Sequence, residues 1–219
     1  MHWQLDCRPA YTVLQVFLEP GEQITAVPGT LLYLKGEIDT KTSSLGIIKG
    51  LKRLLAGSSF FLNTYIAQTE AELWLAPFLP GDVEHLQLEG CYYAKQGAYL
   101  AHSGEIEVSA KFLGFKGLFA EGEFFWLKLE GKGDVWLNSY GGIRKIELKE
   151  GEKIVVNNDY IVAFDASMKF DIRWFGKSLK TKIFGAEYLV VEFTGPGTVY
   201  VQTRNLSPLV CLLAEKIEE

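Results

Sequence analysis

The stretch "GEQITAVPGTLLYL" (residues 21–34) decides the fold, because its pattern returns twice further along the chain. It returns as "GCYYAKQGAYLAH" (90–102) and as "GEKIVVNNDYIVAF" (151–164). Each copy holds a β-rich run, a residue that suits a tight turn, and a second apolar run. The turn residues are Gly29, Gly97, and Asn157 or Asn158, and Asn tolerates a positive φ angle better than most residues. Such self-similarity predicts a fold made of repeated units.

The segments that follow the three copies also recur in one order. A polar strand comes first, then a segment with glycine and lysine, then an aromatic strand. The aromatic strands begin at Gly57, Gly122 and Gly185, which are 65 and 63 residues apart. A unit of about 60 residues buries little surface alone, so we expect three units to share one centre. The chain is therefore predicted to be one domain of three β-repeats, at about residues 11–80, 81–142 and 143–204.

The composition of the runs predicts an all-β fold. They are short, rich in Val, Ile, Tyr, Phe, Trp and Thr, and separated by Gly, Asn and Asp turns, which is typical of a sandwich or barrel. We expect a pseudo-threefold arrangement resembling a β-sandwich or double-stranded β-helix. The tail differs, because "NLSPLVCLLAEKIEE" (205–219) has apolar residues at helical spacing. Ser207 as N-cap and Pro208 at the first helical position predict a short helix at about 207–217.

Charge and cysteine content narrow the classes of function. The 219 residues include 27 acids and 22 bases, for a net charge of −5, which disfavours a general nucleic-acid binder. No secretory signal and no spanning segment is recognisable, so we expect a cytoplasmic protein. Three cysteines lie far apart without metal-binding spacing, and we expect them to be free, buried thiols. They are Cys7, Cys91 and Cys211.

No arrangement of residues indicates catalysis. Histidine is the natural base near neutral pH, and the chain has only His2, His85 and His102. No nucleophile elbow or phosphate-binding motif is present. Acid pairs alternate along strands at Glu70 and Glu72 and at Glu105 and Glu107, where a solvated strand face explains them. We therefore predict that the protein is not an enzyme and has no catalytic residue, metal or cofactor.

The three segments that precede the aromatic strands stand out from the rest of the sequence as a candidate binding feature. They read "LGIIKGLKRLLAG", "KFLGFKGLFAEG" and "RWFGKSLKTKIFG". The candidate residues for contact with an anionic surface or a membrane are Lys49, Lys52, Arg53, Lys116, Lys177, Lys180 and Lys182. Under pseudo-threefold symmetry these segments emerge at one end and form a basic rim. Such a rim suits an anionic membrane or an acidic protein partner, although lysines also guard strand edges against aggregation.

The ordered motifs resemble the altered-inheritance-of-mitochondria family across residues 4 to about 213. They are "GTLLYLKGEID", "GLKRLLAGSSFF", "GAYLAHSGEIEV", "KGLFAEGEFFWLKLEGKGDVWLNSYGGI" and "VYVQTRNL". The resemblance implies a fold similar to the tryptophan RNA-binding attenuator protein, repeated within one chain. It also implies an intracellular, often oligomeric protein without assigned catalytic residues. Its mitochondrial relatives are associated with the inner membrane, and they carry targeting sequences that are not seen here.

These observations predict a non-enzymatic protein that forms a homo-oligomer and acts as a binding or scaffold module. Its partner would be a membrane surface or an acidic protein, reached through the basic rim. The alternative is a protein that binds nucleic acid or a small ligand with the attenuator-like fold. Acidic net charge disfavours the nucleic acid, and a shared fold is weak support for a shared function.

Overall fold

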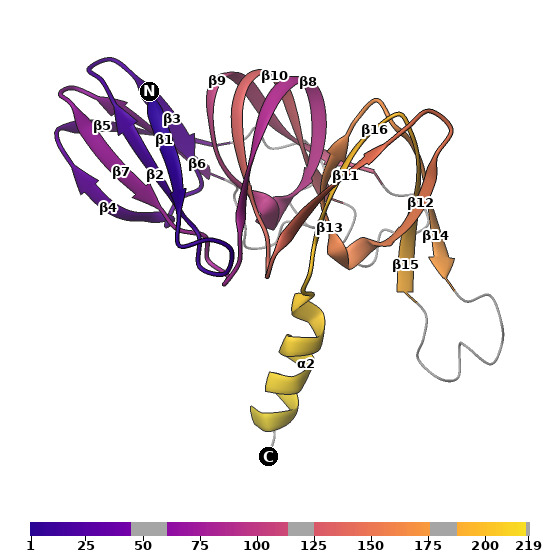
Figure 1. Cartoon of the computed structure of the whole chain (residues 1–219). Helices are drawn as coiled ribbons and strands as arrows, with labels where there is room; N and C mark the ends of the chain where they lie inside the picture. Colours follow the sequence, from indigo (N-terminus) through magenta and orange to yellow (C-terminus); the bar gives the residue numbers. More distant parts are fainter. Residues whose placement is uncertain (45–60, 114–124, 176–187, 218–219) are drawn as a thin grey trace.

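The structure, a computed structural model, describes residues 1–44, 61–113, 125–175 and 188–217. In these residues the chain is built from strands, with one C-terminal α-helix and short 3-10 turns, which confirms the predicted fold class. Figure 1 shows three groups of strands side by side, in the order of the sequence. We call them the first, second and third strand sets, and the exact repeat boundaries stay a prediction.

The strand sets have the following bounds. The first set comprises β1 (His2–Asp6), β2 (Val13–Leu18), β3 (Gln23–Ala26), β4 (Leu31–Lys35), β5 (Ile38–Ser44), β6 (Phe61–Ala67) and β7 (Ala71–Leu75). The second set comprises β8 (Val83–Lys95), η2 (Gln96–Ala98), β9 (Tyr99–Phe112) and β10 (Phe125–Asn138). The third set comprises β11 (Ile143–Leu148), β12 (Lys153–Asn157), η3 (Asn158–Tyr160), β13 (Ile161–Asp165), β14 (Lys169–Phe175), β15 (Tyr188–Thr194) and β16 (Gly197–Gln202).

The order of strands is the same in every set. In the first set β7 lies between β2 and β4, and β6 lies between β3 and β5. In the third set β16 lies between β11 and β13, and β15 lies between β12 and β14. In the second set β10 lies between β8 and β9. The last strands of a set are therefore always central, and its earlier strands lie on either side of them.

The second set differs because its strands continue where the other sets have turns. Gly104 in β9 and Gly131 in β10 have φ angles of +89° and +136°. A Cβ atom on Gly131 would lie 2.0 Å from the carbonyl oxygen of Glu105. Only glycine allows both this backbone conformation and this close approach. These glycines let β9 and β10 bend without breaking, so the second set spans the space between its neighbours.

Two junctions join the second set to one sheet of the first set and one sheet of the third, which gives a nine-stranded sheet. In the first junction β9 pairs with β3, and Ala101 lies opposite Ala26. In the second junction β13 pairs with β8, and Ala163 lies opposite Ala94. All four alanines are fully buried. The two junctions therefore use corresponding strands, and the small side chain at these positions suits the close approach of two sets.

The hydrophobic core is divided along this row of sets. One cluster centres on Leu14, Leu73 and other residues of the first set, and it includes Trp136 of β10. A second cluster lies around β8 and β10. A third centres on Phe164 and Phe193. The second cluster contains residues of all three sets, which agrees with the shared centre expected from the sequence.

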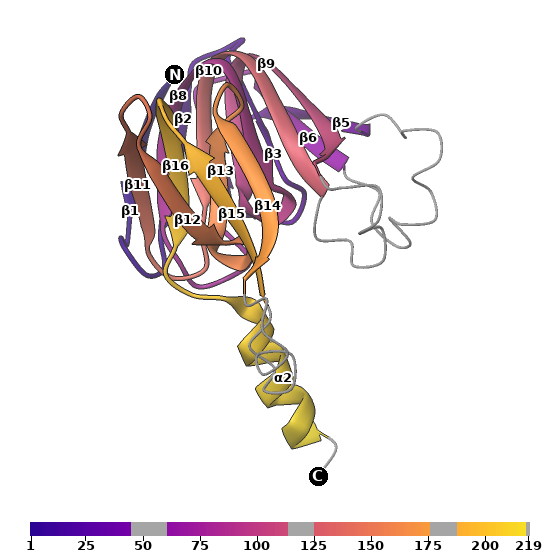
Figure 2. The same ribbon diagram turned by 90° about the vertical axis from the view of Figure 1, so that its right-hand side faces the viewer.

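The C-terminal helix α2 (Leu206–Ile217) is confirmed, with a start one residue before the predicted one. Its N-cap is Asn205, whose Oδ1 accepts a hydrogen bond of 2.9 Å from the backbone N–H of Ser207. The prediction of Ser207 as the cap and of Pro208 as the first helical residue was therefore wrong, because Asn205 offers the same kind of acceptor two residues earlier and the helix begins at Leu206. In Figure 2 the helix projects away from the strands, and none of its residues is buried. Among the described residues, no helix has the length and apolarity needed to cross a membrane.

Candidate interaction surfaces

The seven predicted basic residues lie outside the described residues, so their role stays a prediction. They are Lys49, Lys52, Arg53, Lys116, Lys177, Lys180 and Lys182. The strands on both sides of each segment are described. Their last paired residues are Ser44 with Phe61, Phe112 with Phe125, and Phe175 with Tyr188. Each segment therefore connects a corresponding pair of antiparallel strands, as the repeated sequence pattern indicated.

Aromatic side chains are exposed at two of these three strand ends. Phe61 begins β6, and its side chain is 44% exposed. Trp174 and Phe175 end β14 and are also exposed. Sequence reasoning placed aromatic residues in or beside the segments, but it could not show that they face solvent. Nearby, Arg173 lies 3.3 Å from Glu192, so an ion pair partly offsets its charge.

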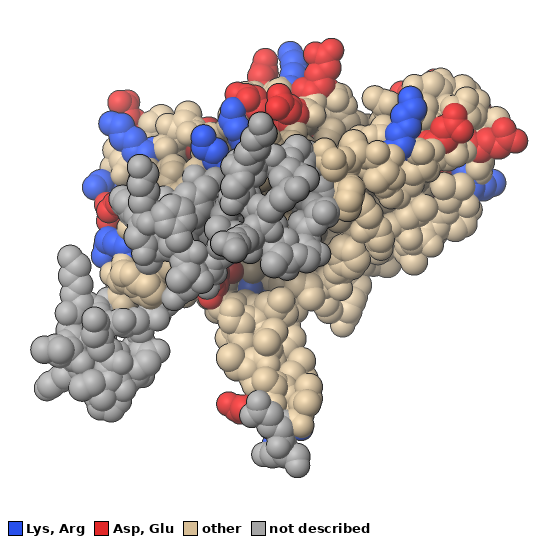
Figure 3. All heavy atoms as spheres, turned by 180° about the vertical axis from the view of Figure 1, so that it is seen from behind, with Lys and Arg blue, Asp and Glu red and all other residues tan. Residues whose placement is uncertain are grey.

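The charges of the described residues are mixed on the face shown in Figure 3. There, Lys and Arg side chains lie among Asp and Glu side chains along the upper part of the molecule. Ion pairs among the described residues include Lys153 with Glu192 at 3.1 Å and Lys145 with Glu147 at 2.6 Å. This face of the described chain thus offers no extended surface of one sign.

Each of the three histidines makes a contact with a neighbouring side chain. His102 in β9 is buried, and its Nδ1 lies 2.6 Å from the hydroxyl oxygen of Tyr99. Burial lowers the pKa of His102 to about 4, so its ring is neutral at pH 7. His85 lies 2.7 Å from Asp134 and packs against Trp3. His2 stacks on Phe17, with ring centroids 5.7 Å apart.

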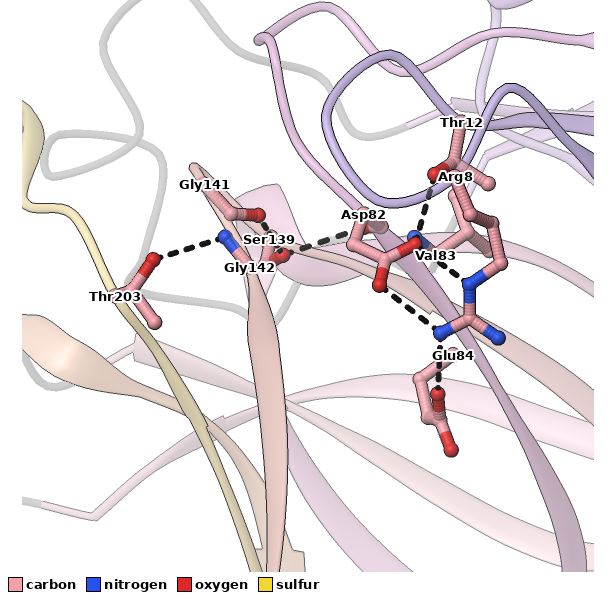
Figure 4. A network of polar contacts seen from close by, with 9 residues as sticks. All are labelled: Arg8, Thr12, Asp82, Val83, Glu84, Ser139, Gly141, Gly142 and Thr203. Atoms are coloured by element: carbon pink, nitrogen blue, oxygen red, sulfur yellow. Dashed lines mark hydrogen bonds and ion pairs between the residues drawn. The ribbon is translucent and has the colours of Figure 1, made fainter.

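A network of polar contacts surrounds Asp82 (Figure 4). The guanidinium of Arg8 donates two hydrogen bonds of 2.9 Å to the two carboxylate oxygens of Asp82. Thr12 Oγ1 donates to Asp82 Oδ1 at 2.7 Å, and Arg8 also contacts Glu84. Asp82 is 4% exposed. Because both of its oxygens are engaged, this carboxylate ties the first set to the second and is not placed for acid–base chemistry.

Backbone contacts extend the same network to the third set. The N–H of Thr12 donates to the carbonyl of Gly81, and the N–H of Asp82 donates to the carbonyl of Gly141. A Cβ atom on Gly81 would lie 1.7 Å from the carbonyl oxygen of Ser139, so only glycine fits there. The residues that precede β2, β8 and β11 are thus hydrogen-bonded in series, which fixes the spacing of the three sets.

The cysteines and acid pairs do not form a metal site in the described residues. All three cysteines are free, as expected. The expectation that they are buried was wrong, because Cys7 lies in a turn after β1 and Cys211 lies on the exposed helix α2. Burial is partial at Cys91, and it raises the pKa of that thiol. The acids Glu105 and Glu107 are exposed on β9, which agrees with a solvated strand face.

A groove lies where the first and second sets meet. Its volume is about 460 Å³, and its lining has no charged side chain. The lining residues include Val27, Phe78, Tyr99 and Asn138. Such a groove is large enough for a small organic molecule, and its polar groups are few.

Two apolar surfaces have no covering element in the described chain. The first is β4, where four successive side chains from Leu31 to Leu34 are each at least 36% exposed. The second is α2, whose exposed apolar residues are Leu206, Leu209, Val210, Leu212, Leu213 and Ile217. Contiguous apolar surface of this kind marks interaction sites in soluble proteins. The sequence patterns predicted both the strand and the helix. An apolar run has the same pattern whether or not a partner covers it, so the exposure of these elements was not predicted.

The fold and these surfaces define a class of protein: an all-β chain of three like strand sets, with an apolar strand and an apolar helix that face outward in the described residues. The family model "Mitochondrial biogenesis AIM24" matches residues 3–204, and the chain belongs to that family. This result confirms the resemblance drawn from the motifs.

Individual relatives give the same placement. An uncharacterized protein of Streptococcus pyogenes serotype M6 is 28% identical over 218 residues, covering 94% of this chain and 87% of the relative. The mitochondrial altered inheritance of mitochondria protein 24 of Verticillium alfalfae is 26% identical over 161 residues. That match covers 72% of this chain and 42% of the fungal protein. A crystal structure of a Streptococcus pyogenes protein has a TM-score of 0.77 and 25% identity, and the match covers 98% of this chain and 99% of that one.

Proposed function

We propose that this chain is a non-enzymatic cytoplasmic scaffold protein that assembles with copies of itself and binds anionic membrane surfaces through its basic rim. The rim comprises the seven basic residues predicted from the sequence. The observation that carries the proposal is the exposure of Phe61, Trp174 and Phe175 beside two of the basic segments. Aromatic rings next to lysines suit the headgroup region of a bilayer, where apolar bodies and cations both find partners.

The described polar groups support a role without catalysis. Both oxygens of Asp82 are occupied by Arg8 and Thr12, and His102 is buried in its neutral form. These groups stabilise the joins between strand sets. Charge and apolar area are prominent on the surface of the described residues, and both are means of binding.

Vesicle co-sedimentation tests the membrane role. Wild-type protein is expected to bind vesicles that contain phosphatidylserine and not vesicles of phosphatidylcholine alone, and high salt should weaken the binding. The variant with Lys49→Glu, Lys52→Glu and Arg53→Glu should lose about 100-fold in affinity, because each base near an anionic bilayer contributes about 1 kcal/mol.

A charge-matched control separates this rim from net charge. Lys132, Arg144 and Lys149 are exposed on or after β10 and β11, and their joint change to Glu alters the net charge equally. This control should keep most of the binding. Equal loss in both variants would show a general charge effect, and no binding by the wild type would reject the membrane role. Binding to an acidic protein but to neither kind of vesicle would also reject it.

The alternative of a small-ligand protein is favoured by the groove between the first and second sets. Its uncharged lining and volume of about 460 Å³ suit a neutral molecule. A native mass spectrum of the purified protein tests this alternative, because a ligand retained in the groove adds a discrete mass. A Phe78→Asp variant should lose that added mass, since Phe78 lines the groove and its side chain is 70% exposed.

A further inference from the structure

Two sheets of the described chain end in a strand that has no neighbouring strand on its outer side, although the corresponding strands of the other sets have one. The four-stranded sheet has the order β1–β2–β7–β4, and the three-stranded sheet has the order β12–β15–β14. Within the described residues, β4 and β12 are paired on one side only. Figure 1 places β4 and β12 at opposite ends of the row of strand sets. β4 and β12 are therefore open edges, and they are two different surfaces.

These two strands correspond to the strands that form the internal junctions. β4, the beginning of β9, and β13 each pair with the last strand of their own set, which is β7, β10 or β16. β3, the end of β8, and β12 likewise pair with β6, β10 or β15. A strand of the first kind meets a strand of the second kind at both internal junctions. Only β4 and β12 do not take part in such a junction in the described chain.

The exposed fractions of corresponding residues show the effect of the missing junction on β4. Its residue Leu34 is 40% exposed, whereas the corresponding residues His102 and Phe164 are 8% and 2% exposed. The other edge shows the same effect, because Val155 of β12 is 46% exposed. Long apolar strand edges left in water promote pairing with another chain.

We propose that β4 of one chain pairs in an antiparallel manner with β12 of a second copy of this chain, which names the contact behind the assembly in the proposed function. The four-stranded and three-stranded sheets then join into one sheet of order β1–β2–β7–β4–β12–β15–β14. A second copy is the occupant because the same chain already makes this contact twice, between corresponding strands.

The internal junctions also fix the register of the new one. Ala101 lies opposite Ala26 in the first junction, and Ala163 lies opposite Ala94 in the second. The same offset places Tyr33 opposite the partner's Val156. It also places Leu34 opposite the partner's Val155, as Phe164 lies opposite Tyr93.

A backbone hydrogen bond follows from this register. In the first junction the N–H of Val27 donates to the carbonyl of Leu100 at 3.0 Å. Corresponding positions in the new junction are the N–H of the partner's Asn157 and the carbonyl of Leu32. Because β4 and β12 are different surfaces, the contact is head-to-tail, and it leads to a closed ring or an open filament rather than a two-fold dimer.

The test uses two variants that each block one edge. Leu34→Lys places a charge on β4, and Val155→Lys places a charge on β12, at side chains that are exposed in the single chain. Light scattering after size exclusion, without lipid, should give the monomer mass of 24.6 kDa for each variant and a larger mass for the wild type. An equimolar mixture should give a heterodimer of twice the monomer mass, because one intact β4 and one intact β12 remain.

The mixture also controls for folding, since a misfolded variant could not restore a defined dimer. Val210→Lys on α2 is the matched control at another exposed apolar residue, and its mass should equal that of the wild type. A monomeric wild type, variants of unchanged mass, or a mixture that stays monomeric would each overturn the proposal. Because no lipid is present, these outcomes do not depend on whether the protein binds membranes.

Discussion

Strands β4 and β13 occupy the same place in the first and third strand sets and yet have opposite surroundings. The run "LLYL" of β4 faces solvent, whereas the run "IVAF" of β13 is buried against β8. Both runs are apolar, and both pair with the last strand of their set. The difference lies in the neighbour, because β13 has another strand set on its outer side. Burial in this fold is thus decided by the junction more than by the strand's own sequence.

The largest expected effect is at the covered strand. Phe164→Ala should lower the free energy of unfolding by about 3–5 kcal/mol, because a large side chain in a packed core leaves a cavity. Its ring lies within 5.5 Å of the rings of Trp126, Phe193 and Tyr93, measured between centroids. Urea denaturation followed by tryptophan fluorescence measures the change. A loss below about 1 kcal/mol would show that this junction is not tightly packed.

A smaller effect is expected at the corresponding residue of the second set. The pKa of His102 falls from 6.5 to about 4 on folding, so the folded state favours the neutral ring. This contribution to stability is complete above pH 6.5 and is lost as the pH falls from 6.5 to 4, by about 3 kcal/mol in total. Denaturation curves measured across this range should therefore show a free energy of unfolding that depends more steeply on pH for the wild type than for His102→Gln. Parallel pH profiles for the two proteins would contradict the burial of this ring.

The smallest effect is expected at the uncovered strand. Leu34→Ala should change the free energy of unfolding of the single chain by less than about 1 kcal/mol, because a side chain that is 40% exposed loses little burial. The measurement belongs at a protein concentration where light scattering shows monomers only. A rise in the effect at higher concentration would then report the contact with a second copy.

The sequence predicts the general architecture because its signals are local. Turn residues such as Gly29 and Gly97, and β-branched runs between them, indicate strands without knowledge of their neighbours. The helix is likewise encoded by the spacing of its apolar residues, although its cap at Asn205 was missed. The pairing of Ala101 with Ala26 depends on residues 75 positions apart, and no local pattern indicates it.

The interaction surfaces were harder to predict from the sequence for the same reason, because they also depend on contacts between residues far apart in the chain. An apolar run such as Leu31–Leu34 reads as core, and only the strand order shows that its outer side is open. The exposure of Phe61 and Trp174 also depends on where strands end in space. The seven basic residues were named from the sequence, and their role awaits the vesicle experiment.

The unbroken strands of the second set have a mechanical consequence. β8 and β10 are in register along their whole common length, from Val83 opposite Asn138 to Lys95 opposite Trp126. The junction between β3 and β9 is much shorter, with paired residues at Thr25 and Ala26 and one further backbone hydrogen bond from Val27 to Leu100. A pulling force between the two chain ends acts on this short junction. Its few hydrogen bonds carry the force together, so they should break before the long pairing of β8 with β10. Under tension, the strand sets should therefore separate from one another before the middle set unravels.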